Sequence, residues 1–218
     1  MRIWIATTLT FIIITSIVCA IKARHSKKAI GKSVALLVCS TIPPVMGNLI
    51  IICSHNEYYS KIGYYIYFLG MDFLMYEMLS FTFEYCHFKK NVVRAKRLLI
   101  FLIILDFIQY FINIFTHHAF DTKLIKADDT DYYQLVPYIG QTLHRILGYG
   151  ILGIVLIIFI VKTVKSPKIY AERYWVILIT MLIVSIWETY YIFSRTPVDS
   201  SMIGFGVYGI LVFYFSLY

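Results

Sequence analysis

The sequence is poor in charge, and poorest in acidic charge. Asp, Glu, Lys and Arg make up only 15% of its 218 residues, with 12 acidic against 20 basic residues. A soluble domain of this length would carry more charge and less apolar surface. The charges stand in short clusters between apolar runs of roughly 18 to 24 residues, each long enough to cross a bilayer core. This pattern excludes a soluble globular domain.

The sequence also lacks the short motifs of common enzymes and metal sites. It contains no HExxH, no GxSxG, no phosphate-binding loop and no CxxC pair, and its last apolar run has no lysine for a retinal Schiff base. The four cysteines lie in or beside apolar runs, so no external disulfide framework is expected. Adjacent Cys86 and His87 would point about 100° apart on a helix, which disfavours a nucleophile–base pair. We therefore predict no catalytic residue, no metal site and no cofactor.

What the sequence does contain is a series of seven apolar runs. Hydrophobic residues make up 60% of the chain, aromatic residues 17%, and the mean hydropathy is +0.74. We predict an all-α polytopic membrane protein, a seven-transmembrane helix bundle that forms one domain over residues 1–218. The predicted spans are Ile3–Ile21, Val34–Cys53, Ile62–Tyr85, Leu98–Thr116, Tyr138–Val161, Tyr174–Phe193 and Ser201–Tyr218.

The basic residues predict the orientation of these spans. Three links, KARHSKKAIGKS, CHFKKNVVRAKR and KTVKSPKIYAER, hold 14 of the 20 Lys and Arg. Because basic links stay in the cytoplasm, Lys28, Lys90 and Lys165 should be cytoplasmic, the N-terminus outside and the C-terminus inside. The basic residues alternate with spans, so the net charge of +8 does not indicate nucleic-acid binding. We expect a multi-pass protein of the inner or plasma membrane.

Two of the links between the predicted spans carry predictions of their own, one because it is basic and one because it is long and acidic. The link Cys86–Arg97 has no Gly or Pro and is predicted to be partly helical, with a basic face of Lys90, Arg94 and Arg97 for anionic lipid headgroups. The longest link, His117–Pro137, should be external. With Asp121, Asp128, Asp129 and Asp131 it is better explained as a solvated acidic loop than as a cation site.

Polar residues inside the spans are the candidate functional residues. Gln141, His144 and Arg145 share one helix face, and an arginine at membrane depth is costly unless it faces the bundle interior and has a partner. Glu188 is the first expected partner of Arg145 and Asp72 the second. Two interpretations remain open for these residues: a structural network, or a ligand pocket in the outer half of the bundle. The candidates are Asn48, Asp72, Gln109, Asn113, Gln141, His144, Arg145 and Glu188.

Several segments resemble those of a known family. FTFEYCHF at the end of the third span, THHAF after the fourth, and RTPVDSSMIGFGVYGILVFYFSLY at the end of the chain are similar to the seven-helix N-terminal sensor region of bacterial histidine kinases and some diguanylate cyclases. The resemblance implies a membrane sensor, without enzymatic activity of its own, that detects an extracellular or membrane-borne signal. It implies as partners membrane lipids, a small-molecule or peptide ligand, and a cytoplasmic signalling domain or subunit. A homodimer is compatible with it.

Other functions are compatible with seven spans. The Pro43–Pro44 pair and Gly148, Gly150 and Gly153 could belong to the broken helices of a small transporter or channel subunit. Cys86–His87 and the carboxylates of the third span leave a membrane enzyme as a further alternative. The sequence ends at Tyr218 within the seventh span, which we interpret as a sensor fragment without its output domain. A standalone relative that signals through another subunit is the alternative.

Overall fold

A computed structural model describes residues 2–88, 91–127, 130–194 and 199–218. In that part of the chain seven helices are interrupted once by a two-stranded antiparallel sheet. The elements are α1 (Arg2–Arg24), α2 (Gly31–Cys53), α3 (Glu57–Tyr85), α4 (Val92–Thr116), β1 (Phe120–Ala127), β2 (Thr130–Pro137), α5 (Ile139–Lys165), α6 (Lys168–Ser194) and α7 (Ser201–Leu217). Every predicted span is therefore a helix.

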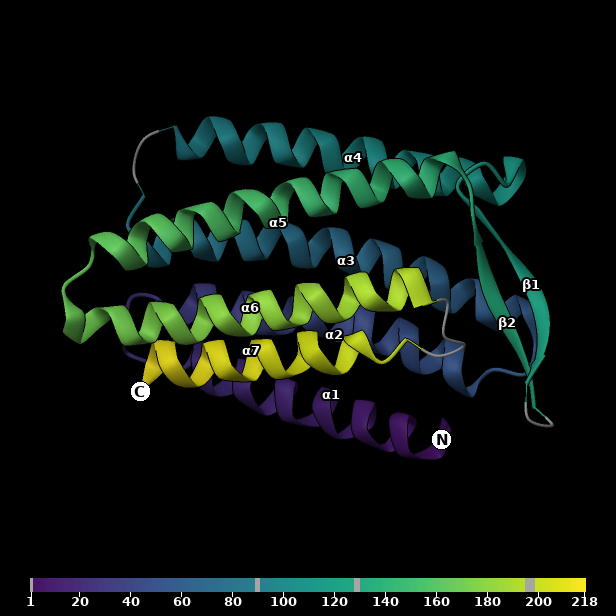
Figure 1. The fold of residues 1–218 in the computed structure, drawn as a ribbon, viewed down its shortest axis with the longest axis horizontal. Helices are drawn as coiled ribbons and strands as arrows, with labels where there is room; N and C mark the ends of the chain where they lie inside the picture. Colours follow the sequence, from purple (N-terminus) through teal and green to yellow (C-terminus); the bar gives the residue numbers. More distant parts are fainter. Residues whose placement is uncertain (1, 89–90, 128–129, 195–198) are drawn as a thin grey trace.

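The helices lie side by side and alternate in direction (Figure 1). The start of α1, the β1–β2 hairpin, the end of α6 and the start of α7 gather at one end, which we call the hairpin end. The ends of α1, α3 and α5 and the starts of α2, α4 and α6 gather at the opposite end with the C-terminus. The predicted basic links thus share one end of the bundle.

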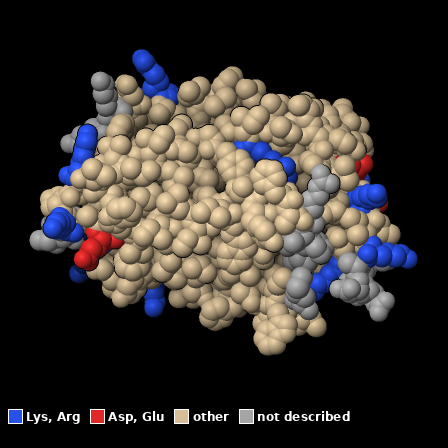
Figure 2. Space-filling model, viewed as in Figure 1, with Lys and Arg blue, Asp and Glu red and all other residues tan. Residues whose placement is uncertain are grey.

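The surface of the bundle suits a membrane. Five helices, α1, α2, α4, α5 and α6, are long and apolar enough to cross a bilayer. The third helix carries Asp72, Glu77 and Glu84, and α7 has only 17 residues. Figure 2 shows Lys and Arg mainly at the two ends of the molecule, with a wide band of uncharged residues between them. Large apolar side chains such as Phe111, Ile157 and Ile186 are exposed within that length.

Glycines bring α2 and α3 into close contact. A Cβ added at Gly47 would lie 2.5 Å from the backbone nitrogen of Tyr67, and one at Gly70 would lie 2.6 Å from the nitrogen of Pro44. Small residues at a helix interface allow such backbone approach in membranes. The second helix continues through Pro43 and Pro44. The glycines Gly148, Gly150 and Gly153 of α5 have nothing within 4 Å of an added Cβ, so they serve no comparable packing contact.

The link His117–Pro137, predicted as a solvated acidic loop, contains two antiparallel strands, β1 and β2, so the all-α prediction does not hold for this link. Phe120 pairs with Pro137 and Leu124 with Tyr133 in an antiparallel register. The buried Phe120 packs on Tyr64 and Phe68 of α3, so one end of the hairpin covers the bundle. Besides its acidic residues, the link contains β-branched and aromatic residues, which favour strands. Asp128 and Asp129 lie outside the described residues.

The link Cys86–Arg97 is partly helical, as predicted, but only its second half belongs to a helix. The third helix ends at Tyr85, and His87 has a positive φ of 53°. The fourth helix begins at Val92 and contains Arg94 and Arg97. Lys90 lies outside the described residues, so the full basic face is not tested.

Candidate functional site

A polar cavity lies near the hairpin end of the bundle. Its volume is about 510 Å³, within the range of small-molecule sites. Helices α2, α3, α5 and α6 line it together with β2, the start of α1 and the residue Asp199 before α7. Aromatic side chains on its walls come from Tyr64, Tyr67 and Phe68 of α3 and Tyr191 of α6. The cavity therefore combines apolar walls with charged groups.

Five of the eight candidate residues face this cavity: Asn48, Gln141, His144, Arg145 and Glu188. Asp72 lines a smaller cavity of about 40 Å³, which shares His144, Arg145 and Glu188 with the larger one. The structure thus brings together polar residues from α2, α3, α5 and α6 at one level of the bundle.

Gln109 and Asn113 do not line the cavity. The Gln109 amide donates to the Gly140 carbonyl at 3.0 Å and to the carboxylate of Asp106. The Asn113 side chain accepts from the backbone N–H of Ala119 at 2.7 Å. Asn113 therefore holds the end of α4 to the connection before the hairpin, and Gln109 holds α4 to the start of α5.

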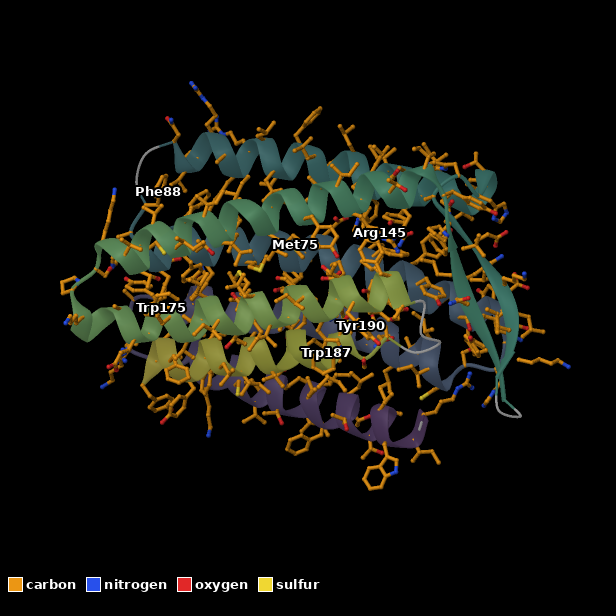
Figure 3. The ribbon with its side chains drawn as sticks, in the orientation of Figure 1. Met75, Phe88, Arg145, Trp175, Trp187 and Tyr190 are labelled. Carbon is orange, nitrogen blue, oxygen red and sulfur yellow. The ribbon has the colours of Figure 1, made fainter. Side chains whose placement is uncertain are left out.

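The expected ion pair of Arg145 is not formed. In the described part of the chain, no ion pair within 4.0 Å joins Arg145 to Glu188 or to Asp72. Figure 3 places Arg145 between α5 and α6. With the Gln141 amide turned so that its oxygen faces the guanidinium, Arg145 donates to it from Nε at 3.3 Å and Nη2 at 3.1 Å. Arg145 therefore bonds to Gln141, one turn away on its own helix, and faces the open cavity. It does not pair with the predicted partner on α6.

Asp199 is a cavity residue that was missing from the candidates. Its carboxylate accepts from the Ser201 backbone N–H at 2.8 Å, the Ser201 hydroxyl at 2.6 Å and the Tyr67 hydroxyl at 3.1 Å. Its carbonyl accepts from the Asn48 amide at 2.6 Å. Burial raises the pKa of Asp199, although the bonds from Ser201 and Tyr67 oppose that shift. The only sequence signal was its place in the segment that resembles the sensor family.

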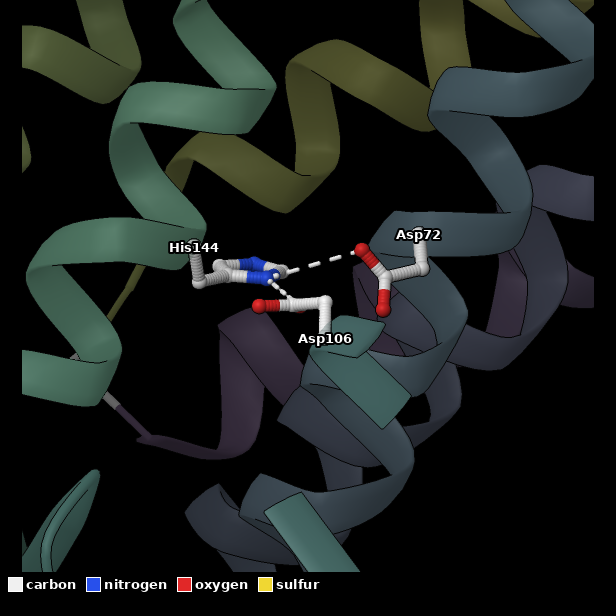
Figure 4. A group of neighbouring side chains, drawn as sticks. All are labelled: Asp72, Asp106 and His144. Atoms are coloured by element: carbon white, nitrogen blue, oxygen red, sulfur yellow. Dashed lines mark hydrogen bonds and ion pairs between the residues drawn. The ribbon is translucent and has the colours of Figure 1, made fainter. Parts of the chain in front are cut away.

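A second group, the carboxylate–histidine cluster, consists of Asp72 of α3, Asp106 of α4 and His144 of α5. The His144 Nδ1 atom is 2.6 Å from Asp106 Oδ2 and 3.5 Å from Asp72 Oδ1. Figure 4 shows the three side chains converging from three helices. All three residues are buried, and their ligand atoms lie within 4.8 Å of one another, as a bound metal ion would require. Asp106 is not among the eight candidate residues.

The fold and the site define a multi-pass helical membrane protein with a polar cavity near one end. Residues 3–218 match the family described as the N-terminal 7TM region of histidine kinase, and the chain belongs to this family. The resemblance read from the sequence is thereby confirmed. A comparison with curated proteins finds none that matches.

Proposed function

We propose that this chain is a sensory input module with seven membrane spans, its hairpin end outside the cell and its C-terminus in the cytoplasm. A small molecule or the end of a peptide binds in the polar cavity. The binding changes the position of α7, which passes the signal to a cytoplasmic histidine kinase or diguanylate cyclase. The family supports a sensory role, and the gathering of basic links at the C-terminal end supports the orientation.

The observation that carries the proposal is the position of Asp199. It lines the cavity and also accepts the hydrogen bonds of Ser201 at the start of α7. Through Tyr67 and Asn48 the same residue is bonded to α3 and α2. A ligand that competes for Tyr67 or for the Asp199 carboxylate would therefore change the contacts that fix α7. Such differential contact is what a ligand needs in order to shift a conformational equilibrium.

The cavity also indicates the chemistry of the ligand. Arg145 offers a guanidinium, while Glu188 and Asp199 offer carboxylates. Tyrosine and phenylalanine rings supply flat apolar surface between them. A ligand with separate acidic and basic groups on an apolar body would satisfy both signs of charge.

The proposal can be tested in a chimera in which a histidine-kinase core follows α7, reconstituted in nanodiscs. We expect Tyr67→Phe to change basal autophosphorylation, because it removes the hydroxyl that joins α3 to Asp199 while keeping the ring. Arg145→Gln should abolish the response to an activating extract. Arg24→Gln, at the opposite end of the bundle, is the matched control and should leave the response intact. Equal output from Tyr67→Phe and the unaltered chimera, with an unchanged response in Arg145→Gln, would reject the proposal.

A further inference from the structure

With both carboxyl groups ionised, the carboxylate–histidine cluster would carry more negative charge than its surroundings balance. Asp72, Asp106 and His144 are 5%, 7% and 8% exposed. In the described chain no Lys or Arg nitrogen lies within 4.0 Å of either carboxylate; the only ion-pair partner of both is the imidazole of His144. Even a protonated imidazole would balance one of two carboxylates. Buried charge of this kind is expensive unless it is paired or coordinates a metal.

One oxygen of the cluster also lacks a hydrogen-bond partner. Asp72 Oδ2 is fully buried and accepts no hydrogen bond from any described residue. In Figure 4 the Asp72 oxygen that faces the imidazole is Oδ1, and the other oxygen of the same carboxylate, Oδ2, points away from the ring. An unsatisfied buried acceptor calls for an explanation. A cation bound by the Asp72 carboxylate would supply it.

The surrounding residues hold two of the three side chains in place. The Gln109 amide donates both to the carboxylate of Asp106 and, through its other proton, to the Gly140 carbonyl, which fixes the carboxylate relative to α5. The rings of Phe68 and Tyr110 stand edge-on to the imidazole of His144, with centroids 5.3 and 5.4 Å away. Outer contacts of this kind orient metal ligands and are part of the site.

We propose that Asp72, Asp106 and His144 bind a divalent transition-metal cation such as Zn²⁺. In a tetrahedral site with bonds of about 2.0–2.1 Å the ligand atoms are about 3.3 Å apart. The distances of 2.6 and 3.5 Å from His144 Nδ1 to the two carboxylates bracket that value, so small side-chain movements suffice. One imidazole with two carboxylates favours a transition ion over Mg²⁺ or Ca²⁺, which prefer oxygen ligands alone.

The site has an access route and an open coordination position. His144 lines the large polar cavity, and both His144 and Asp72 line the small cavity beside it. A cation can therefore enter from the hairpin end. Three protein ligands leave a fourth position for water or for a group of a cavity ligand. Binding of the cation does not rest on the proposed sensory function.

The first test uses the tag-free chain in nanodiscs, stripped with a chelator and titrated with ZnCl₂. We expect one Zn²⁺ per chain by calorimetry, in the presence of excess Mg²⁺. X-ray absorption should show one nitrogen and two or three oxygen neighbours at about 2.0–2.2 Å. Two results would overturn the proposal. One is a chain that binds no Zn²⁺, as expected if the two carboxyl groups share a proton instead. The other is an ion with sulfur ligands.

Substitutions then assign the ligands. Gln109→Ala removes an outer partner of the site and should weaken Zn²⁺ binding by roughly 10- to 100-fold. The ligand variants Asp72→Asn, Asp106→Asn and His144→Ala should each weaken it by more than that. Glu77→Gln is the matched control, since it removes another buried carboxylate of α3 that is 6% exposed. His55→Ala removes an exposed imidazole. Unchanged affinity in all three ligand variants, or an equal loss in the controls, would place the ion elsewhere.

Discussion

At the scale of single residues, the polar groups inside the bundle divide into three roles. Asn113 holds α4 to the connection before the hairpin, and Gln109 holds α4 to the start of α5. Arg145 and Glu188 face open space in the cavity. Asp199 joins the cavity to the start of α7. All are buried or half-buried polar side chains on apolar helices or, for Asp199, just before one, so burial and polarity alone do not separate a structural residue from a candidate ligand-binding one.

The geometry of Arg145 gives a prediction about its energetic coupling to Glu188. Breaking a buried ion pair from one side costs about 3–5 kcal/mol, and removing both partners recovers much of it. Because Arg145 and Glu188 form no direct pair, we expect a coupling energy of about 1 kcal/mol or less in a double-mutant cycle of Arg145→Gln and Glu188→Gln. Thermal or denaturant unfolding in detergent measures it. A coupling near the value for a broken pair would show that the two side chains meet in solution.

At the scale of elements, the contact between α2 and α3 depends on backbone proximity. Gly47→Ala would place a methyl group 2.5 Å from the backbone nitrogen of Tyr67, and backbone cannot rotate away as a side chain can. We expect a loss of stability of about 1–3 kcal/mol from overpacking, visible as a lower Tm in detergent.

Gly150→Ala is the matched control for this packing. An added Cβ at Gly150 meets nothing within 4 Å, and alanine favours a helix over glycine by about 1 kcal/mol. The control should therefore be neutral or stabilising. Equal Tm changes in the two variants would argue against a close α2–α3 contact.

The hairpin is attached to α3 by a small charge network outside the spans. Lys61 Nζ lies 2.8 Å from Glu57 and 2.9 Å from Asp121 of β1. Hydrogen bonds from Lys61 and Thr122 lower the pKa of Glu57. Burial alone would raise the pKa of Asp121, but hydrogen bonds from Lys61 and the Thr122 backbone outweigh it and lower that pKa too.

These pKa shifts predict how attachment of the hairpin depends on pH. Carboxyl groups whose pKa is lower in the folded state add stability above their unfolded pKa and lose it as pH falls through the folded value. We expect the hairpin to become more sensitive to an acid-tolerant protease between about pH 5 and pH 2. Lys61→Met should remove most of this dependence, whereas Lys123→Met, on an exposed residue of the same strand, should keep it. A pH profile that Lys61→Met leaves unaltered would contradict the role of the network.

At the scale of the whole molecule, the orientation of the bundle can be measured directly. Single cysteines in place of Lys28 and Lys165 mark the end with the basic links, and one in place of Lys123 marks the hairpin. In a background without native cysteines, we expect a membrane-impermeant maleimide to label only position 123 in intact cells. Labelling at position 28 or 165 before lysis would contradict the proposed orientation.

The sequence by itself determined which segments are helices. Apolar runs long enough to span a bilayer can satisfy their backbone groups only within the segment, so composition and length are sufficient. Three helices end at the predicted residue, at Cys53, Tyr85 and Thr116. The family could also be predicted, because it follows from segments such as THHAF and GFG that lie along one chain.

Only the tertiary structure decided which side chains meet. Depth along a span can be counted from the sequence, but the rotation of each helix and its neighbours depend on packing between helices. Depth therefore predicted an ion pair between Arg145 and Glu188, which the structure does not contain. Packing between helices instead places His144 of α5 beside Asp106 of α4 and Asp72 of α3. The hairpin is a similar case, because its position depends on the contacts of Phe120 and Asp121 with α3, residues more than fifty positions away in the chain.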